Sequence, residues 1–260
     1  MPHRLESFEP PIHAMIQGAS RGIGLGFVRA LLEDERVETL VATSRRPEQS
    51  DPLRWLRDDH PRRLHLVELD VTDEASVRTA ARSVGEMTDQ LHFLFNVAGL
   101  LHDEAREIHP EKSLDDIDPE HLQRSFAVNA TGPILVAKHF HPLFRHGRRA
   151  VFANMSARVG SIGDNHKGGW YAYRASKAAQ NQLTRTLAIE MGRKAPETIC
   201  VALHPGTVDT DLSEPFQNYV PDDQLFSVEE SVDKLLAVID GLEHDDTGRF
   251  FDYAGEPIEW

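Results

Sequence analysis

Near its start the chain passes from a short apolar run through a glycine-rich turn into a helical pattern, and this succession constrains the fold more than any other feature. The apolar run is IHAMIQ, the turn GASRGIG spans residues 18–24, and the helical pattern is LGFVRALLED. Strand, tight turn and helix in this order begin a βαβ unit. The turn has the spacing G-x-x-x-G-x-G rather than G-x-G-x-x-G, so by itself it fits a plain turn as well as a nucleotide site.

The glycines of this turn have separate uses. Gly18 allows the chain to reverse tightly, whereas Gly22 and Gly24 let the backbone approach a phosphate and let the helix pack closely on the strand. The first N–H groups of the helix have no intrahelical partners, so they are suited to bind an anion.

Apolar strands alternate with helical patterns along the rest of the chain. Further strands are expected at residues 38–44, 63–69, 91–99, 148–156, 198–205 and 248–255, and helices at 73–87, 121–144, 171–192 and 227–242. The alternation predicts an α/β fold: a single Rossmann-type, doubly wound domain over residues 1–260, with about seven mostly parallel strands and helices on both faces. No repeat, low-complexity tract or linker divides the sequence.

The second strand ends in Ser44, Arg45 and Arg46. At this place in a dinucleotide fold an acidic residue binds the ribose 2′-OH, whereas an arginine accommodates a 2′-phosphate. The acidic residue is absent and arginine is present, which favours NADPH over NADH, with Ser44 and Arg45 as the expected contacts. Two exposed arginines in a turn remain the alternative.

The third and fourth strands also end in residues suited to a ligand. Asp70 and Val71 follow the third strand, and Asp70 is expected near the adenine because ligands of such sheets lie beyond the carboxyl ends of the strands. The fourth strand ends with Asn96, Ala98 and Gly99, whose small size would let a cofactor lie against the backbone.

Two local features are expected in the helices. Thr72 or Asp73 is placed to cap the helix over residues 73–87. In the helical pattern 121–144, an amide, Asn129, precedes Gly132 and Pro133, which predicts a local kink. Asn129 would then hold a water or a backbone carbonyl near the site, or serve as a buried structural amide.

Tyr173 and Lys177 stand four residues apart at the start of a helix, which puts both side chains on one face. A cation beside a phenol stabilises phenolate and lowers its pKa, so the pair predicts a general acid for carbonyl chemistry. Taken alone, the spacing more often belongs to a partly buried helix tyrosine beside a solvated lysine. Two irregular segments, about 100–118 and 209–227, are expected to cover the substrate.

Composition excludes several classes of partner. The formal charge of −14 argues against nucleic acid or an anionic membrane surface, which need a basic face. No apolar run approaches the length of a membrane span, and the start of the chain carries charges and prolines. A single cysteine, Cys200, agrees with a reducing compartment, so a cytoplasmic protein is predicted. The spacing of His139, His141 and His146 does not predict a metal site.

The combination of motifs resembles the short-chain dehydrogenase/reductase family over essentially the whole chain. The motifs are GASRGIG, Asp70-Val71, NVAG at 96–99, Asn129, YRASK at 173–177 and HPGTV at 204–208, in family order. Within the family, GSIGDN, GGWYAYRASKAA and the ending FFDYAGEPIEW are similar to the branch of C-factor signalling proteins and sniffer-type carbonyl reductases.

The resemblance implies roles for named positions. Tyr173 would protonate the carbonyl oxygen as hydride arrives, Lys177 would lower the tyrosine pKa and bind the nicotinamide ribose, and Asn129 would support a water in a proton relay. The implied cofactor is NADPH, with NADH disfavoured, the substrate is a small carbonyl or alcohol, and many relatives form homodimers or homotetramers. The implied cofactor contacts, beyond those already named, are Gly18, Ser20, Arg21, Gly22, Ile23, Gly24, Asp70, Val71, Asn96, Ala98, Gly99, Tyr173, Lys177, Pro205, Gly206, Thr207 and Val208.

One departure from the family pattern concerns the catalytic serine. The family usually has Asn-x-Ser-Ser after the fifth strand, and its second serine binds the substrate carbonyl; here Asn154-Met155-Ser156-Ala157 puts alanine in that place. Ser156 and Ser161 are the two candidates to replace it. Because loss of such a donor costs about 10²–10³ in rate, a weakly active or regulatory, cofactor-binding protein is the alternative to a carbonyl reductase.

Overall fold

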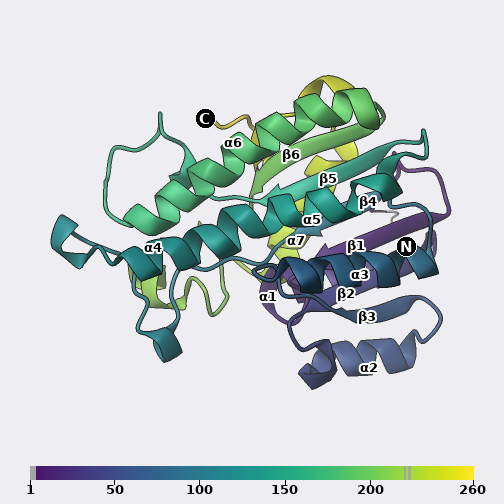
Figure 1. Ribbon diagram of the computed structural model, residues 1–260, viewed down its shortest axis with the longest axis horizontal. Helices are drawn as coiled ribbons and strands as arrows, with labels where there is room; N and C mark the ends of the chain where they lie inside the picture. Colours follow the sequence, from purple (N-terminus) through teal and green to yellow (C-terminus); the bar gives the residue numbers. More distant parts are fainter. Residues whose placement is uncertain (1–3, 220, 222–223) are drawn as a thin grey trace.

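A parallel, seven-stranded sheet forms the centre of the computed structural model, which describes residues 4–219, 221 and 224–260 (Figure 1). The strand order is β3-β2-β1-β4-β5-β6-β9. Along the chain, β2 and β3 are added on one side of β1 and the later strands on the other side, as in a doubly wound fold. All six pairings in this sheet are parallel. The predicted fold class is therefore confirmed. The strands are β1 (Ile12–Gln17), β2 (Val37–Ser44), β3 (Leu64–Glu68), β4 (Phe93–Asn96), β5 (Ala150–Met155), β6 (Thr198–His204) and β9 (Phe250–Asp252).

Helices cover both faces of the sheet. One face packs on α1 and α7, and the other packs on α3, α5 and α6, because successive strand residues such as Ala14 and Met15 point into different hydrophobic clusters. Figure 1 shows α3, α5 and α6 on the near side of the sheet. The helices are α1 (Gly22–Leu32), α2 (Asp51–Asp59), α3 (Glu74–Met87), α4 (Pro119–Phe126), α5 (Gly132–Phe140), α6 (Tyr171–Lys194) and α7 (Val228–Gly241).

The helical pattern over 121–144 is interrupted where the sequence predicted a kink. A π-helical turn, Ala127–Thr131, separates α4 from α5, and Asn129 lies inside it. Gly132 begins α5 at a close approach to the loop after β3, since a Cβ there would lie 2.7 Å from the Cβ of Val71. The wide turn therefore carries Asn129 inward, towards the start of α6.

Helix caps follow the sequence in part. Asp73 caps α3 by accepting a hydrogen bond from the N–H of Ala75, so of the two candidates it is the capping residue. Ser227 caps α7 in the same way through the N–H of Glu230. The N-cap position of α6, Trp170, makes no side-chain cap.

Three elements were not expected from the sequence. Helix α2 has a strongly polar pattern, in which Leu53 is the buried residue, so its apolar signal is weak. A small second sheet pairs β7 (Thr207–Val208) with β8 (Leu225–Phe226) at the two ends of the predicted irregular segment 209–227. Within that segment, residues 220 and 222–223 lie outside the described residues. None of the helices in the described ranges is long and apolar enough to cross a membrane.

Candidate functional site

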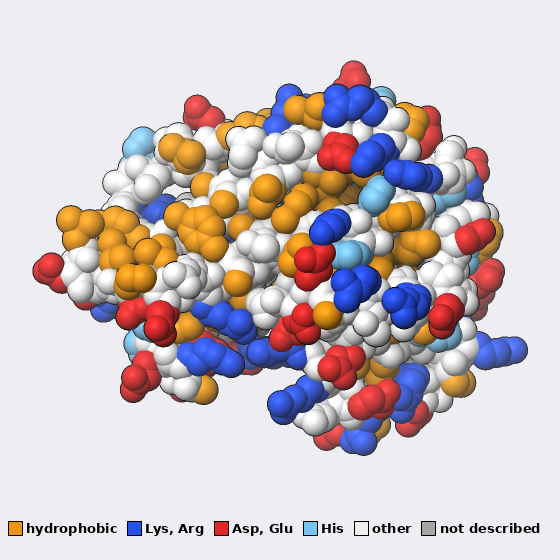
Figure 2. All heavy atoms as spheres, viewed as in Figure 1, with side chains coloured by type: hydrophobic (Ala, Val, Ile, Leu, Met, Phe, Trp, Pro, Cys, Tyr) orange, Lys and Arg blue, Asp and Glu red, His pale blue; other side chains and the backbone are white. Residues whose placement is uncertain are grey.

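A cleft of about 2710 Å³ runs along the carboxyl ends of the central strands. Its lining includes residues that follow β1, β2, β3, β4, β5 and β6. Ligand pockets usually measure about 300–1000 Å³, so this cleft has room for an extended ligand together with a second, smaller one. Figure 2 shows basic side chains gathered beside the hollow below the projecting segment of the molecule.

The glycine-rich turn forms one end of the cleft with almost no spare space. Gly18 has a φ of +86°, and a Cβ there would lie 2.6 Å from the backbone nitrogen of Ala98. A Cβ on Gly24 would lie 2.1 Å from the carbonyl oxygen of Gly18. Helix α1 begins at Gly22 without a side-chain cap, which leaves its first N–H groups free for a phosphate. This cradle fits the pyrophosphate of a dinucleotide.

The next part of the cleft lies at the ends of β2 and β3. The hydroxyl of Ser44 is buried and has no hydrogen-bond partner, so it fits a polar ligand group. Burial raises the pKa of Asp70, but hydrogen bonds from the hydroxyl and amide of Thr72 and the nearby Arg124 and Arg45 outweigh it and hold the pKa below its usual value. An ionised carboxylate beside two arginines suits the adenine ribose end of a nucleotide.

Tyr173 and Lys177 lie together on the first turns of α6, and both line the cleft. The Nζ atom of Lys177 is 5.8 Å from the centre of the Tyr173 ring. It donates hydrogen bonds to the backbone oxygen of Met155 at 2.6 Å and to Oε1 of Gln180 at 3.2 Å. Gly160 permits this approach, because a Cβ there would lie 2.7 Å from the Cβ of Lys177.

Burial dominates the electrostatics of this pair. Desolvation lowers the pKa of Lys177 to about 7 and raises the pKa of Tyr173 above its usual value. Burial thus sets the direction of the pKa shift for both groups, and a lowering of the tyrosine pKa by Lys177 stays a prediction. Near neutral pH the tyrosine therefore keeps its proton, whereas the lysine changes charge.

Asn129 is fully buried behind the cleft and does not line it. Its side chain accepts a hydrogen bond from the N–H of Leu100 at 2.7 Å and donates to the carbonyl oxygen of Leu100 at 2.8 Å and to the hydroxyl of Ser176 at 3.0 Å. Asn129 thus fixes the backbone of Leu100, which does line the cleft, and ties it to α6.

The residues around the missing serine differ in orientation. Ala157 and Ser156 line the cleft, but the hydroxyl of Ser156 donates a 2.6 Å hydrogen bond to Oδ1 of the buried Asn181. Ser161 is buried outside the lining, and its hydroxyl accepts from the N–H of Asp164. Neither hydroxyl therefore takes the place of the family's second serine, the position that Ala157 occupies here.

Most residues singled out from the sequence meet in this cleft, and the exceptions are Asn96, Asn129 and Ser161. Asn96 is buried beneath it and donates to Oδ1 of Asn154, so together with Asn129 it supports the lining rather than forming it. The lining also contains residues that the sequence reasoning missed: Leu101, His102, Arg124, Met155, Trp170, His204 and Phe216. Of these, Trp170 stood next to the motif around Tyr173, and His204 opens the motif HPGTV, so proximity to a motif was the available signal.

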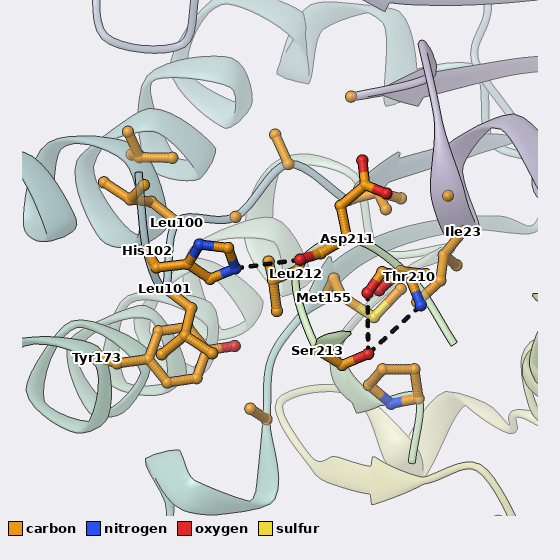
Figure 3. Close-up of a pocket in the computed structure, with 18 of the residues that line it drawn as sticks. Ile23, Leu100, Leu101, His102, Met155, Tyr173, Thr210, Asp211, Leu212 and Ser213 are labelled. Carbon is orange, nitrogen blue, oxygen red and sulfur yellow. Dashed lines mark hydrogen bonds between the residues drawn. The ribbon is translucent and has the colours of Figure 1, made fainter. Parts of the chain in front are cut away.

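Part of the cleft near Tyr173 is lined by residues of the two irregular segments. Figure 3 shows Leu100, Leu101 and His102 on one side and Asp211, Leu212 and Ser213 on the other, with Tyr173 below Leu101 and His102. A contact of 3.1 Å between Nε2 of His102 and the carbonyl oxygen of Asp211 joins the two segments. Residues of both segments thus line the cleft together with Tyr173, and their covering of a substrate stays a prediction.

Comparisons with known proteins agree with this architecture. Residues 12–219 match the family model described as short chain dehydrogenase. The C-signal of Myxococcus xanthus is 39% identical over 149 residues, which cover 57% of this chain and 84% of that protein. The NADPH-bound carbonyl reductase from chicken fatty liver has a TM-score of 0.86 at 32% identity, covering 99% of this chain and 98% of that chain. The carbonyl reductase Sniffer of D. melanogaster has a TM-score of 0.85 at 29% identity, covering 97% and 100%.

Proposed function

Because the chain belongs to the short-chain dehydrogenase family, as its motifs predicted, we propose that it is an NADPH-dependent reductase of small carbonyl compounds. The single observation that carries the proposal is the position of Tyr173 and Lys177 in the same cleft as the glycine-rich turn. A proton donor thereby faces the end of a site suited to a dinucleotide.

The chain's own residues would divide the work as follows. Bound NADPH supplies the hydride. Tyr173, protonated near neutral pH because its pKa is raised by burial, donates its hydroxyl proton to the substrate's carbonyl oxygen. Lys177, held by the carbonyl of Met155 and by Gln180, binds the nicotinamide ribose and returns a proton to the tyrosine. Asn129 fixes the loop at Leu100 and supports a relay of protons through water.

The proposed cofactor contacts follow the cleft from end to end. The glycine-rich turn holds the pyrophosphate, Asp70 and Val71 contact the adenine, and Ala98 and Gly99 lie against the nucleotide. Ser44 and Arg45 would contact the 2′-phosphate. Because NADPH carries this phosphate and NADH lacks it, these two residues favour NADPH. The NADPH-bound carbonyl reductase of similar structure supports the same preference. Residues 205–208 would lie at the nicotinamide.

The test is a search for turnover. The purified protein is incubated with NADPH and a panel of aldehydes, ketones and quinones while the absorbance of NADPH is followed. The proposal expects oxidation of NADPH that depends on the carbonyl compound. A folded protein that binds NADPH but oxidises it with no member of the panel would contradict the proposal.

A second candidate is a cofactor-binding signalling protein with weak catalysis. It is favoured by Ala157 in the serine position and by the similarity to C-signal. Tyr173→Phe separates the two: a regulator that acts through cofactor binding keeps its biological effect, whereas a reductase loses it. We further propose that residues 1–260 form one domain, which limited proteolysis would test, and that the protein is a homo-oligomer, which sedimentation would test.

A further inference from the structure

The chain enters α6 through three successive residues in left-handed conformation. Gly168, Gly169 and Trp170 have φ values of +65°, +67° and +52°. Two glycines adopt this conformation without strain, but a tryptophan does so at a cost in free energy. Among the described residues, Glu107 is the other non-glycine residue with positive φ. Strain of this kind persists where surrounding contacts enforce it, and it concentrates at functional sites.

Glu111, far from α6 in the sequence, supplies those contacts. Its carbonyl oxygen accepts a 2.6 Å hydrogen bond from the N–H of Trp170, and its carboxylate accepts a 3.1 Å hydrogen bond from the N–H of Ala172. The side chain is 4% exposed although it bears a carboxylate. A negative group at a helix N-terminus is stabilising, and here it replaces the cap that Trp170 does not provide.

The contact joins an irregular segment to the helix that carries Tyr173. Figure 1 shows the segment 100–118 projecting beside the start of α6. In the described part of the chain, both hydrogen bonds between residues 109–117 and the start of α6 are made by Glu111. The neighbouring N–H groups of Lys112 and Ser113 bond within the segment, to Asp116. Glu111 is therefore the anchor of this part of the segment.

The left-handed conformation directs the Trp170 side chain into the cleft. Its ring lies edge-to-face with Tyr173 at 6.2 Å and against Phe216 at 4.8 Å, measured between ring centres. Phe216 in turn lies 6.1 Å from the ring of His102. All four side chains line the cleft. The rings of Trp170, Phe216 and His102 thus form a row along the cleft, and Trp170 is the ring of the row that lies against Tyr173.

We propose that Trp170 is the specificity-determining wall of the substrate site and that Glu111 is a positioning residue that holds it there. The inference rests on the proposed reductase function. A carbonyl compound whose reacting carbon carries a flat ring packs its ring on Trp170, in an offset or edge-on arrangement, while its oxygen meets Tyr173. Glu111 touches neither substrate nor cofactor, and it acts through the conformation of residues 168–172.

The variants distinguish loss of the Glu111 side chain from loss of its charge alone and from loss of another glutamate in the same segment. Glu111→Ala removes the carboxylate that accepts from Ala172 and leaves the backbone carbonyl that accepts from Trp170, whereas Glu111→Gln keeps a side-chain oxygen that accepts from Ala172. Glu107→Ala, which removes an exposed glutamate of the same segment, is the matched control. Trp170→Leu removes the wall itself. Each variant is made in the natural chain and also with Trp55→Phe and Trp260→Phe, which leave Trp170 as the one tryptophan of the three.

Two readouts are recorded. The first, for every variant except Trp170→Leu, is the Trp170 emission without substrate, which reports the environment of the indole. The second is the ratio of kcat/KM for a phenyl ketone to kcat/KM for its cyclohexyl counterpart, with NADPH affinity measured in parallel. Loss of aromatic packing on Trp170 should lower the ratio about 3- to 10-fold in Trp170→Leu and in Glu111→Ala. Glu111→Ala should also shift the emission to longer wavelength, and Glu111→Gln and Glu107→Ala should match the parent protein in both readouts.

The outcomes decide the inference separately from the function. A Glu111→Ala variant with unchanged Trp170 emission and an unchanged ratio of kcat/KM for the two ketones would overturn the role of Glu111. This holds also when kcat/KM falls by the same factor for both ketones. An unchanged ratio in Trp170→Leu would overturn the role of Trp170. A parent protein that reduces other members of the panel but neither ketone would overturn the substrate part of the inference and leave the proposed function standing, whereas no turnover with any member would contradict both. In either case the emission would still decide whether Glu111 positions Trp170.

Discussion

The Nζ atom of Lys177 donates a 2.6 Å hydrogen bond to the backbone oxygen of Met155, the last residue of β5. A buried ammonium is thereby tied to the end of the strand that precedes Ser156 and Ala157. The contact satisfies part of the ammonium's hydrogen-bonding capacity, but it brings no negative charge to it. Desolvation therefore determines the pKa of Lys177 and lowers it.

The first prediction concerns stability against pH. The pKa of Lys177 is lowered to about 7 in the folded protein from 10.5, so between these values the unfolded chain binds more protons than the folded one. The free energy of unfolding should rise as pH increases from about 7 towards 10. Lys177→Met should remove this rise, by an amount on the order of a few kcal/mol across the window.

Urea unfolding at several pH values measures this slope. Lys194→Met, at the exposed end of the same helix, is the control and should keep it. Equal slopes in the parent protein and Lys177→Met would mean that the lysine is not desolvated as the structure has it.

A second prediction concerns acid. His92 is buried, its ring centre lies 4.7 Å from that of His146, and its Nδ1 accepts from the N–H of His13. Burial, followed by the nearby positive groups, lowers the pKa of His92 to about 3 from 6.5. Because the unfolded chain takes up this proton first, stability should fall as pH drops from about 6.5 to 3. His92→Leu should flatten that part of the profile, whereas the exposed His244→Leu should not; the comparison is made by thermal unfolding.

A third prediction concerns cofactor choice. If Arg45 binds the 2′-phosphate, Arg45→Ala should weaken NADPH binding about 10- to 100-fold, as for the loss of a charge-assisted hydrogen bond, and should affect NADH little. Titration of both cofactors by intrinsic fluorescence measures the two constants. Arg57→Ala, which removes an arginine paired with Glu48, is the control. Equal losses for the two cofactors would exclude this role for Arg45.

The fourth prediction concerns the missing serine. Ala157 lines the cleft, and neither Ser156 nor Ser161 offers a free hydroxyl in its place. Ala157→Ser should therefore raise kcat, by about tenfold or more, because it restores a hydrogen-bond donor at the carbonyl oxygen. Ser161→Ala should leave kcat unchanged. An unchanged kcat in Ala157→Ser would indicate that another group already fills this role.

The sequence predicted the framework better than the surroundings of the reacting atoms. The glycine-rich turn, Asp73 at the start of α3 and the irregular turn at Asn129 rest on local geometry, which sequence records directly. Trp170 and Glu111 could not be paired from the sequence, because their contact joins segments that only the fold brings together. The pKa of Tyr173 could not be predicted either, since it depends on how completely the cleft excludes water.

The fifth prediction tests the central claim, that Tyr173 protonates a carbonyl oxygen. Tyr173→Phe keeps the ring against Trp170 and removes only the hydroxyl. The most direct measurement is kcat for NADPH oxidation with the best carbonyl substrate of the panel, beside the Kd for NADPH of the same preparation. We expect kcat to fall by about 10²–10⁴-fold, as for the loss of a general acid, with Kd nearly unchanged. A Tyr173→Phe protein that binds NADPH and turns over at the parent rate would contradict the account.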